Sequence, residues 1–271
     1  MTNFEARIAD NEFEQFRKIL YDIAGISLSP AKKALVISRL SKRLDHFGLN
    51  DFGAYLQMIR LKEHAAELQT TVDLLTTNET YFFREPKHFK FLQDYIDGTY
   101  KRGQPLRIWS AACSSGQEPY SIAMILQDML GDAQWQIMAS DISTQILAKA
   151  VKGLYPIAQA ENIPQPYLKR FCLKGTGSHE GSFLVDKALR DKVSFFQANL
   201  NQALPGIGEF DLIFLRNVMI YFDTETKVEV VKRLQRVLKP GGYLIIGHSE
   251  TLNGISDRFK MVLPAVYQNL D

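Results

Sequence analysis

The chain has 271 residues, 46% of them hydrophobic, which is enough to bury a sizeable core without help from disulfides or metals. Lysine and arginine (32) nearly balance aspartate and glutamate (30), so the formal charge of +2 gives no global electrostatic reason to bind nucleic acid or a membrane surface. Cys113 and Cys172 lie far apart and favour reduced thiols. With no signal peptide and no run of about 18 apolar residues, we expect a cytoplasmic protein that is not inserted in a membrane.

The first part of the chain has the apolar spacing of amphipathic helices. Apolar residues recur at steps of three and four and stop at glycines, which commonly end helices. The predicted helices end at Gly25, run from Ser29 and Pro30 to Gly48, and cover residues 51–61 and 65–75. We therefore expect an all-helical N-terminal domain over residues 1–76, followed by a linker and a helix over 77–105.

From about Leu106 onward, short apolar runs alternate with helical segments, which favours βαβ units around a parallel sheet. The candidate strands are LRIWSA, WQIMAS, VSFFQA, FDLIFL and YLIIGH, with helices after Gln117, Ser143 and Asp223. The last helix is predicted to end at LKPGG, interpreted as a helix stop and turn, and the runs around Pro264 predict a closing hairpin. A stretch rich in proline and glycine at about 155–191 predicts a small antiparallel β-subdomain inserted in a domain over 106–271.

The segment after the first predicted strand has the features of a ligand-binding turn. Its small residues, SAACSSG, leave the backbone open to a ligand, but the phosphate-binding patterns G-x-x-x-x-G-K-[ST] and G-x-G-x-x-G are missing. Glu118 opens the next helix, where a carboxylate can hold a ligand's amino group, and Asp141 ends the second strand, where it can accept both ribose hydroxyls. An amine and a ribose without phosphate indicate S-adenosylmethionine (SAM); the alternative for each carboxylate is simple helix capping.

Four motifs resemble one protein family in the same order. They are TTNETYFFRE (76–85), SAACSSGQEPYS (110–121), ASDIS (139–143) and LRNVMIYFD (215–223), and they resemble the CheR family of chemotaxis receptor glutamate O-methyltransferases. The resemblance implies an α/β fold with a Rossmann-like, SAM-dependent methyltransferase sheet, an inserted antiparallel β-subdomain and an all-helical N-terminal domain. It also implies SAM as cofactor, S-adenosylhomocysteine (SAH) as product and no metal. The cofactor contacts it implies are Asn78, Thr80, Arg84, Glu118, Asp141, Asn199, Leu200, Arg216 and Asn217.

The reaction that the resemblance implies is attack of a glutamate carboxylate on the methyl group of SAM. A glutamate with a pKa of about 4.3 is already ionised at neutral pH, so no general base is needed. Positioning is then the main contribution, worth about 7 to 11 kcal/mol. Arg84 and Tyr221 are the catalytic candidates, because a guanidinium and a phenol can both orient a carboxylate. Alternatively, Arg84 excludes other nucleophiles or forms an interdomain ion pair, and Tyr221 is a partly buried aromatic residue.

The resemblance also implies a partner, the helical cytoplasmic signalling domain of methyl-accepting receptors, modified by a monomeric enzyme during adaptation. Segment 29–47 has five Lys or Arg against one acidic residue, and its helical wheel gathers Lys32, Arg39, Lys42, Arg43 and His46 on one face. We expect this face to dock acidic receptor helices; a solvated face is the alternative. The segment KGTGSHEGSFLV resembles family members that add a receptor's C-terminal peptide as a strand, although ordinary hairpins share such turns.

Two other functions fit the sequence less well. Amide and amine methyltransferases commonly carry an Asp/Asn-Pro-Pro-aromatic run after the fourth strand, where this chain has RNVMIYF. A SAM-binding sensor without activity is disfavoured by the intact Arg84 and Tyr221.

Cys113 is expected to be a small apolar residue beside the cofactor; a reactive thiol is the alternative. The histidines lack metal-ligand spacing and are assigned surface or capping roles; they are His46, His64, His88, His179 and His248.

Overall fold

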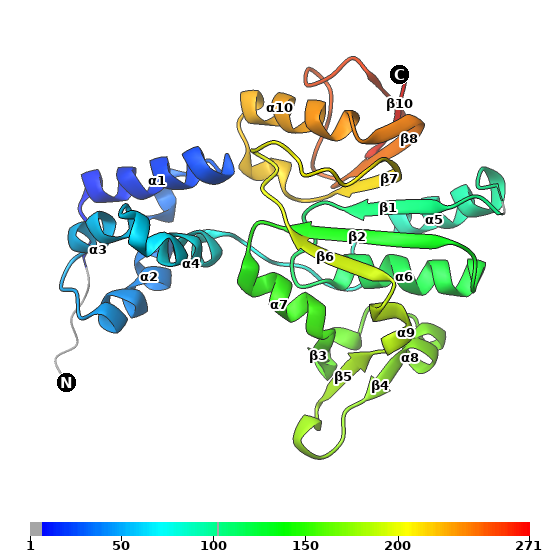
Figure 1. The fold of residues 1–271 in the computed structure, drawn as a ribbon, viewed down its shortest axis with the longest axis horizontal. Helices are drawn as coiled ribbons and strands as arrows, with labels where there is room; N and C mark the ends of the chain where they lie inside the picture. Colours follow the sequence, from blue (N-terminus) through cyan, green and yellow to red (C-terminus); the bar gives the residue numbers. More distant parts are fainter. Residues whose placement is uncertain (1–6, 102) are drawn as a thin grey trace.

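Figure 1 shows a computed structural model of the chain, in which a helical N-terminal part is followed by a large sheet, and a small sheet is inserted in the sequence between two strands of the large one. The structure describes residues 7–101 and 103–271. Residues 1–6, which belong to the predicted N-terminal domain, and residue 102, in the predicted linker, lie outside the described residues.

The N-terminal part is helical, as the apolar spacing predicts. Phe16, Leu40 and Tyr55 lie at the centre of its core and are essentially inaccessible to solvent. Its helices are α1 (Asp10–Ala24), α2 (Lys33–Phe47), α3 (Phe52–Ile59) and α4 (Ala65–Leu75), with short 3-10 turns η1 (Pro30–Lys32) and η2 (Lys62–His64). The start of the second helix differs from the expectation, because Ser29 and Pro30 begin the 3-10 turn η1 and the α-helix follows it.

A seven-stranded sheet forms the second part, in the order β6-β2-β1-β7-β8-β10-β9. Its strands are β1 (Leu106–Ser110), β2 (Trp135–Asp141), β6 (Val193–Gln197), β7 (Phe210–Leu215), β8 (Leu238–Ile246), β9 (Phe259–Leu263) and β10 (Val266–Asn269). The strands from β6 to β8 pair in parallel, whereas β10 is antiparallel to both β8 and β9. The predicted βαβ arrangement and closing hairpin are both confirmed.

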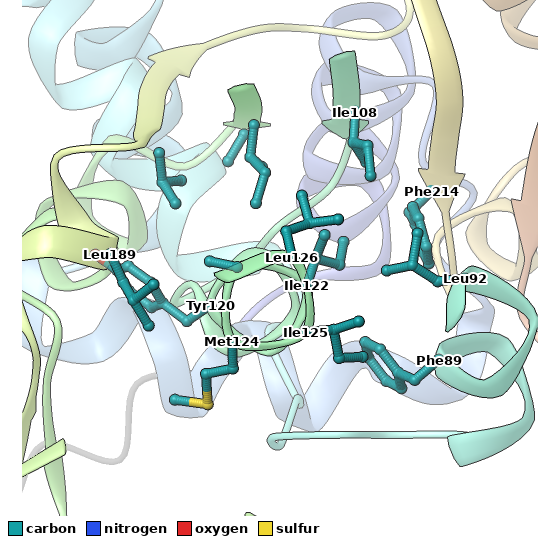
Figure 2. Close-up of a cluster of buried hydrophobic side chains, with 14 of the residues drawn as sticks. Phe89, Leu92, Ile108, Tyr120, Ile122, Met124, Ile125, Leu126, Leu189 and Phe214 are labelled. Atoms are coloured by element: carbon teal, nitrogen blue, oxygen red, sulfur yellow. The ribbon is translucent and has the colours of Figure 1, made fainter. Parts of the chain in front are cut away.

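Helices cover the sheet, and its two faces contribute to two separate apolar clusters. The flanking helices are α5 (Pro86–Gly98), α6 (Gln117–Leu130), α7 (Thr144–Lys152) and α10 (Thr224–Gln235). Successive residues of β1 alternate, with Ile108 in one cluster and Trp109 in the other. Figure 2 shows Ile122 and Leu126 of α6 in the first cluster, near Phe214 of β7. Each such fully buried side chain stabilises the fold by about 1.5–3 kcal/mol.

The small sheet is inserted between α7 and β6, where the sequence predicts a β-subdomain. Its three strands are antiparallel in the order β3-β5-β4. The segment comprises β3 (Leu154–Pro156), η3 (Ile157–Ala160), α8 (Gln165–Phe171), β4 (Cys172–Lys174), η4 (Gly177–His179), β5 (Ser182–Val185) and α9 (Lys187–Arg190).

The interpretation of LKPGG as a helix stop and turn is wrong. Helix α10 ends at Gln235, and Leu238 to Gly242 form the first half of β8. The pairing of β8 with β7 shifts register here, and Gly241 has a φ of 72°. A Cβ on Gly242 would lie 2.9 Å from the carbonyl oxygen of Asp211, so the glycines serve a bulge inside the strand.

Among the described helices, none combines the length and the apolar character needed to cross a membrane.

Candidate functional site

A cavity of about 460 Å³ opens at the carboxyl ends of the parallel strands, next to the N-terminal helices. This volume is typical of small-molecule sites. The cavity lies beside β1, where the strand order reverses, with β2 and β6 on one side and β7 and β8 on the other. Open α/β sheets bind ligands at such a position. The cavity gathers every residue that the sequence analysis named as a cofactor contact or catalytic candidate. They are Asn78, Thr80, Arg84, Glu118, Asp141, Asn199, Leu200, Arg216, Asn217 and Tyr221.

Glu118 is held by hydrogen bonds to both of its carboxylate oxygens. It lies in the first turn of α6, where the Ser110 hydroxyl donates to its Oε1 at 2.6 Å and Arg216 Nη1 donates to its Oε2 at 2.8 Å. Each carboxylate oxygen can accept a second hydrogen bond, so both retain acceptor capacity toward the cavity. Ser110 was not among the predicted site residues; the predicted strand LRIWSA ran to Ala111, whereas Ser110 is the last residue of β1.

Arg216 lies between three acceptors of the protein itself. Beyond Glu118, its Nη2 donates to Glu85 Oε2 at 3.1 Å and to the carbonyl oxygen of Arg84. Its side chain is 3% exposed, and its Nε has no hydrogen-bond partner within the described part of the chain. Arg216 therefore joins the Arg84 segment to the start of α6 at the wall of the cavity.

Asp141 lies at the end of β2 and is held by backbone groups. The backbone N–H of Ser114 donates to its Oδ2 at 2.9 Å, and that of Ser143 donates to its Oδ1 at 3.0 Å. Burial raises the pKa of Asp141, while these hydrogen bonds work in the opposite direction. The turn before α6 needs Gly116, whose φ is 95° and whose Cβ position is only 3.0 Å from the Tyr155 hydroxyl.

Arg84 is positioned by its own segment. Its Nη1 donates to the carbonyl oxygen of Glu79 at 2.9 Å, and its guanidinium carbon lies 5.8 Å from the centre of the Tyr81 ring. Across residues 7–101 and 103–271, Arg84 has no carboxylate within ion-pair distance, which gives no support to the interdomain ion pair considered above. Its half-buried guanidinium lines the cavity.

The loop that carries Tyr221 is attached to the N-terminal helical part. The backbone N–H of Ser27 donates to the carbonyl oxygen of Tyr221 at 2.8 Å, and Ile26 forms an antiparallel bridge with Phe222. The side chain of Asn199 also donates to the carbonyl oxygen of Ile23 at 2.6 Å. These contacts make the segment between α1 and α2 a wall of the cavity, which no local signal in the sequence predicted.

Two further carboxylates organise the loops around the cavity, and neither was among the predicted site residues. Glu85 Oε1 accepts from Asn217 Nδ2 at 3.2 Å. Glu250, which follows β8, accepts backbone N–H groups from Asn217 at 3.0 Å, Ile220 at 3.2 Å and Gly247 at 2.6 Å. Asn217 has a φ of 56°, so these contacts hold a residue in a backbone conformation that few side chains adopt.

The predicted basic docking face is only partly free. Arg39 donates to the carbonyl oxygens of Leu74 and Thr76, at 3.1 and 2.7 Å. Arg43 makes two hydrogen bonds with the buried carboxylate of Glu67, at 2.8 and 2.5 Å. The two arginines thus bind groups of their own domain. Lys32 and Lys42 are exposed and have no ion-pair partner among the residues described, and Lys32 also lines the cavity.

Burial tests the roles that the sequence predicted for His88 and Cys113. His88, assigned a surface or capping role, is 1% exposed, so that assignment is wrong; burial, with Arg216 nearby, lowers its pKa to about 3 and keeps the ring neutral. The Cys113 thiol is buried at the cavity wall, and burial raises its pKa, which disfavours a reactive thiolate.

Comparison with known proteins gives consistent matches over both parts of the chain. Residues 11–76 match the family model "CheR methyltransferase, all-alpha domain", and residues 78–267 match "CheR methyltransferase, SAM binding domain". A chemotaxis protein methyltransferase from Escherichia coli is 42% identical over 265 residues, covering 96% of this chain and 91% of that protein. Chemotaxis protein methyltransferase 2 from Pseudomonas aeruginosa is 44% identical over 268 residues, covering 98% and 95%.

Proposed function

The chain belongs to the CheR methyltransferase family, and on that premise we propose that it methylates glutamate side chains of chemotaxis receptors with SAM. The products are glutamate 5-methyl esters and SAH. The observation that carries this proposal is the convergence of all the candidate cofactor and catalytic residues on one cavity between the helical part and the sheet. We further propose that the enzyme acts as a cytoplasmic monomer.

The residues of the cavity fit SAM. Glu118 retains acceptor capacity for the amino group of the cofactor, and Asp141 can accept ribose hydroxyl groups. The turn lacks a phosphate cradle, in keeping with a cofactor that has no phosphate. The other proposed contacts line the same cavity and are Asn78, Thr80, Arg84, Asn199, Leu200, Arg216 and Asn217.

When bound, SAM supplies an electrophilic methyl group, and the protein orients the carboxylate that attacks it. The incoming glutamate is ionised at neutral pH, so the chain needs no base to remove a proton. Arg84 and Tyr221 line the cavity, and we propose that they orient the glutamate carboxylate through the guanidinium and the phenol. Positioning of this kind lowers a barrier by about 7 to 11 kcal/mol.

For the protein substrate, we propose that acidic receptor helices dock at the free cations of the N-terminal helices. Lys32 and Lys42 carry this proposal, because Arg39 and Arg43 are engaged within their own domain. We also propose that a receptor's C-terminal peptide adds to an edge of the small sheet, where β3 and β4 each have one side that pairs with no other described strand.

The decisive experiment is incubation of the purified chain with methyl-labelled SAM and receptor signalling domains. We expect the label to enter the receptor and to leave as methanol in alkali, because methyl esters hydrolyse in base. Label that resists alkali, or no label in any receptor while SAH binds, would contradict the proposed reaction.

A further inference from the structure

Three side chains that the proposed reaction does not use meet beside the cavity. Glu85 is the N-cap residue of α5, His88 lies in the first turn of that helix, and His248 lies in the loop after β8. One ligand atom from each residue lies within 4.8 Å of those from the other two. The rings of His88 and His248 have their centres 4.6 Å apart.

His88 is the unusual member of this cluster. Its side chain is 1% exposed, yet neither ring nitrogen has a hydrogen-bond partner within residues 7–101 and 103–271. Its Nδ1 is 3.3 Å from Glu85 Oε2 without hydrogen-bond geometry. Buried polar atoms are nearly always satisfied in folded proteins, so a ring with two unmet nitrogens indicates a missing partner.

We propose that Glu85, His88 and His248 bind a divalent transition metal ion of the zinc class. Two imidazoles and one carboxylate are a donor set that zinc prefers, and three protein ligands leave a fourth position for water. Glu85 caps α5 with a φ of 57° and His88 lies in the first turn of the same helix, so one short segment supplies two of the three ligands. His248 is exposed, so an ion can reach the cluster from solvent and the ring can turn toward it.

Arg216 is the charged group that competes with the ion. Its Nη2 is 3.1 Å from the same Glu85 oxygen that faces His88, while its Nη1 binds Glu118. Glu85 and Glu118 carry two negative charges, against the one positive charge of Arg216. The remaining negative charge offsets the charge of an arriving cation. Metal binding would draw Glu85 away from Arg216, and Arg216 would then hold Glu118 more tightly. The metal and a ligand at Glu118 should therefore weaken each other's binding.

The test is a zinc titration of the full chain, freed of tags and chelator, against a chromogenic zinc indicator. We expect one zinc ion per chain. His248→Gln should weaken zinc affinity by more than about tenfold. Even the loss of a residue that only hydrogen-bonds to a metal ligand lowers metal affinity about 10- to 100-fold. His179→Gln, on an exposed turn of the small sheet, is the matched control and should bind as the parent does.

Absence of stoichiometric zinc binding, or binding equally tight in His248→Gln, would overturn the proposal. His88→Gln tests the buried ligand, and a folded variant that keeps the parent's zinc affinity would overturn it as well. The coupling is tested separately by SAH titration with and without zinc, an arm that rests on the proposed function. If SAH fails to bind at all, the proposed function fails while the zinc result stands; equal SAH affinity in both conditions would refute the coupling.

Discussion

Two networks among the described residues join an arginine to a buried carboxylate, and they differ in what they leave unsatisfied. In the N-terminal helices, Glu67 accepts two hydrogen bonds from Arg43 and one from the Tyr55 hydroxyl, which also meets Thr71. At the sheet, Arg216 binds Glu118 and Glu85, but one of its nitrogens has no partner in the described part of the chain, and its neighbours face a cavity.

The difference separates stability from binding. A network that is fully satisfied inside the protein has no capacity for a ligand and contributes to the fold alone. The network around Arg216 keeps acceptor atoms on Glu118 directed at the cavity, so a ligand can complete it. Substitutions in the two networks should therefore affect different measurements.

The largest expected effect is the loss of stability in Arg43→Met. The substitution leaves the Glu67 carboxylate buried without its cation, and breaking a buried pair in this way costs about 3 kcal/mol. Chemical denaturation measures this loss, and SAH titration of the folded variant should give the parent's affinity. A variant as stable as the parent would show that the contact contributes nothing to the fold.

The same network predicts how stability depends on pH. Burial alone would raise the pKa of Glu67, but hydrogen bonds from Arg43 and Tyr55 outweigh it, so the pKa is lowered overall. A carboxyl whose pKa is lower in the folded state contributes stability above its unfolded pKa of about 4.5, and that stability is lost as the pH falls through the folded value. In Arg43→Met, the free energy of unfolding should lose less on acidification than it does in the parent. Denaturation measured at neutral pH and at a pH below the folded pKa of Glu67 would show the difference.

The next effect belongs to the cavity network, in Glu118→Gln. The amide keeps the shape of the side chain but removes the charge that faces a cofactor amine, and hydrogen bonds to charged groups contribute about 1.5–3 kcal/mol. We expect SAH affinity to fall by about 10- to 100-fold in calorimetry. Unchanged affinity would remove Glu118 from the cofactor site.

A smaller effect is expected for Tyr221→Phe. If the hydroxyl orients the target carboxylate, its loss costs one hydrogen bond, about 0.5–1.5 kcal/mol, and lowers kcat by up to about tenfold while SAH affinity is kept. Tyr21→Phe is the matched control, because that hydroxyl binds Asp223 of the same loop from outside the cavity. Equal kcat in the parent and Tyr221→Phe would remove the hydroxyl from the reaction.

The smallest effect is expected at the exposed cations, in Lys32→Glu and Lys42→Glu. Exposed charge pairs contribute about 0.2–1 kcal/mol and are screened by salt, so the KM for receptor should rise a few-fold at low ionic strength and converge with the parent at high salt. A KM that is unchanged at low salt would exclude these lysines from docking. The variants leave the Arg43 network intact, which separates docking from stability.

The sequence predicted those parts of the molecule that depend on neighbouring residues. Glu118 and Asp141 could be found because Glu118 opens the helix after β1 and Asp141 ends β2, and parallel strands bring such positions to one edge of the sheet. The apolar spacing predicted an amphipathic helix at α2, and the structure buries its Val36, Leu40 and Leu44. The spacing could not show that Arg43 meets Glu67, because that contact joins two different helices.

The remaining features depend on pairing between distant segments. LKPGG has the local signals of a turn, but Leu238 pairs with Phe210 of β7 and the segment begins strand β8. His88 and His248 are 160 residues apart in number, and only the fold brings their rings together. The Glu85 and Glu250 contacts with Asn217 have the same origin.

The bridge between Ile26 and Phe222 has a consequence for how the enzyme would exchange its ligand. The pocket is lined on one side by the segment between α1 and α2, so relative motion of the two units, the N-terminal helices and the sheet, would change access to it. If release of the ligand needs such a motion, its rate would limit turnover even when methyl transfer is fast. A covalent tie between the two units should therefore prolong ligand residence without altering any group that touches the ligand.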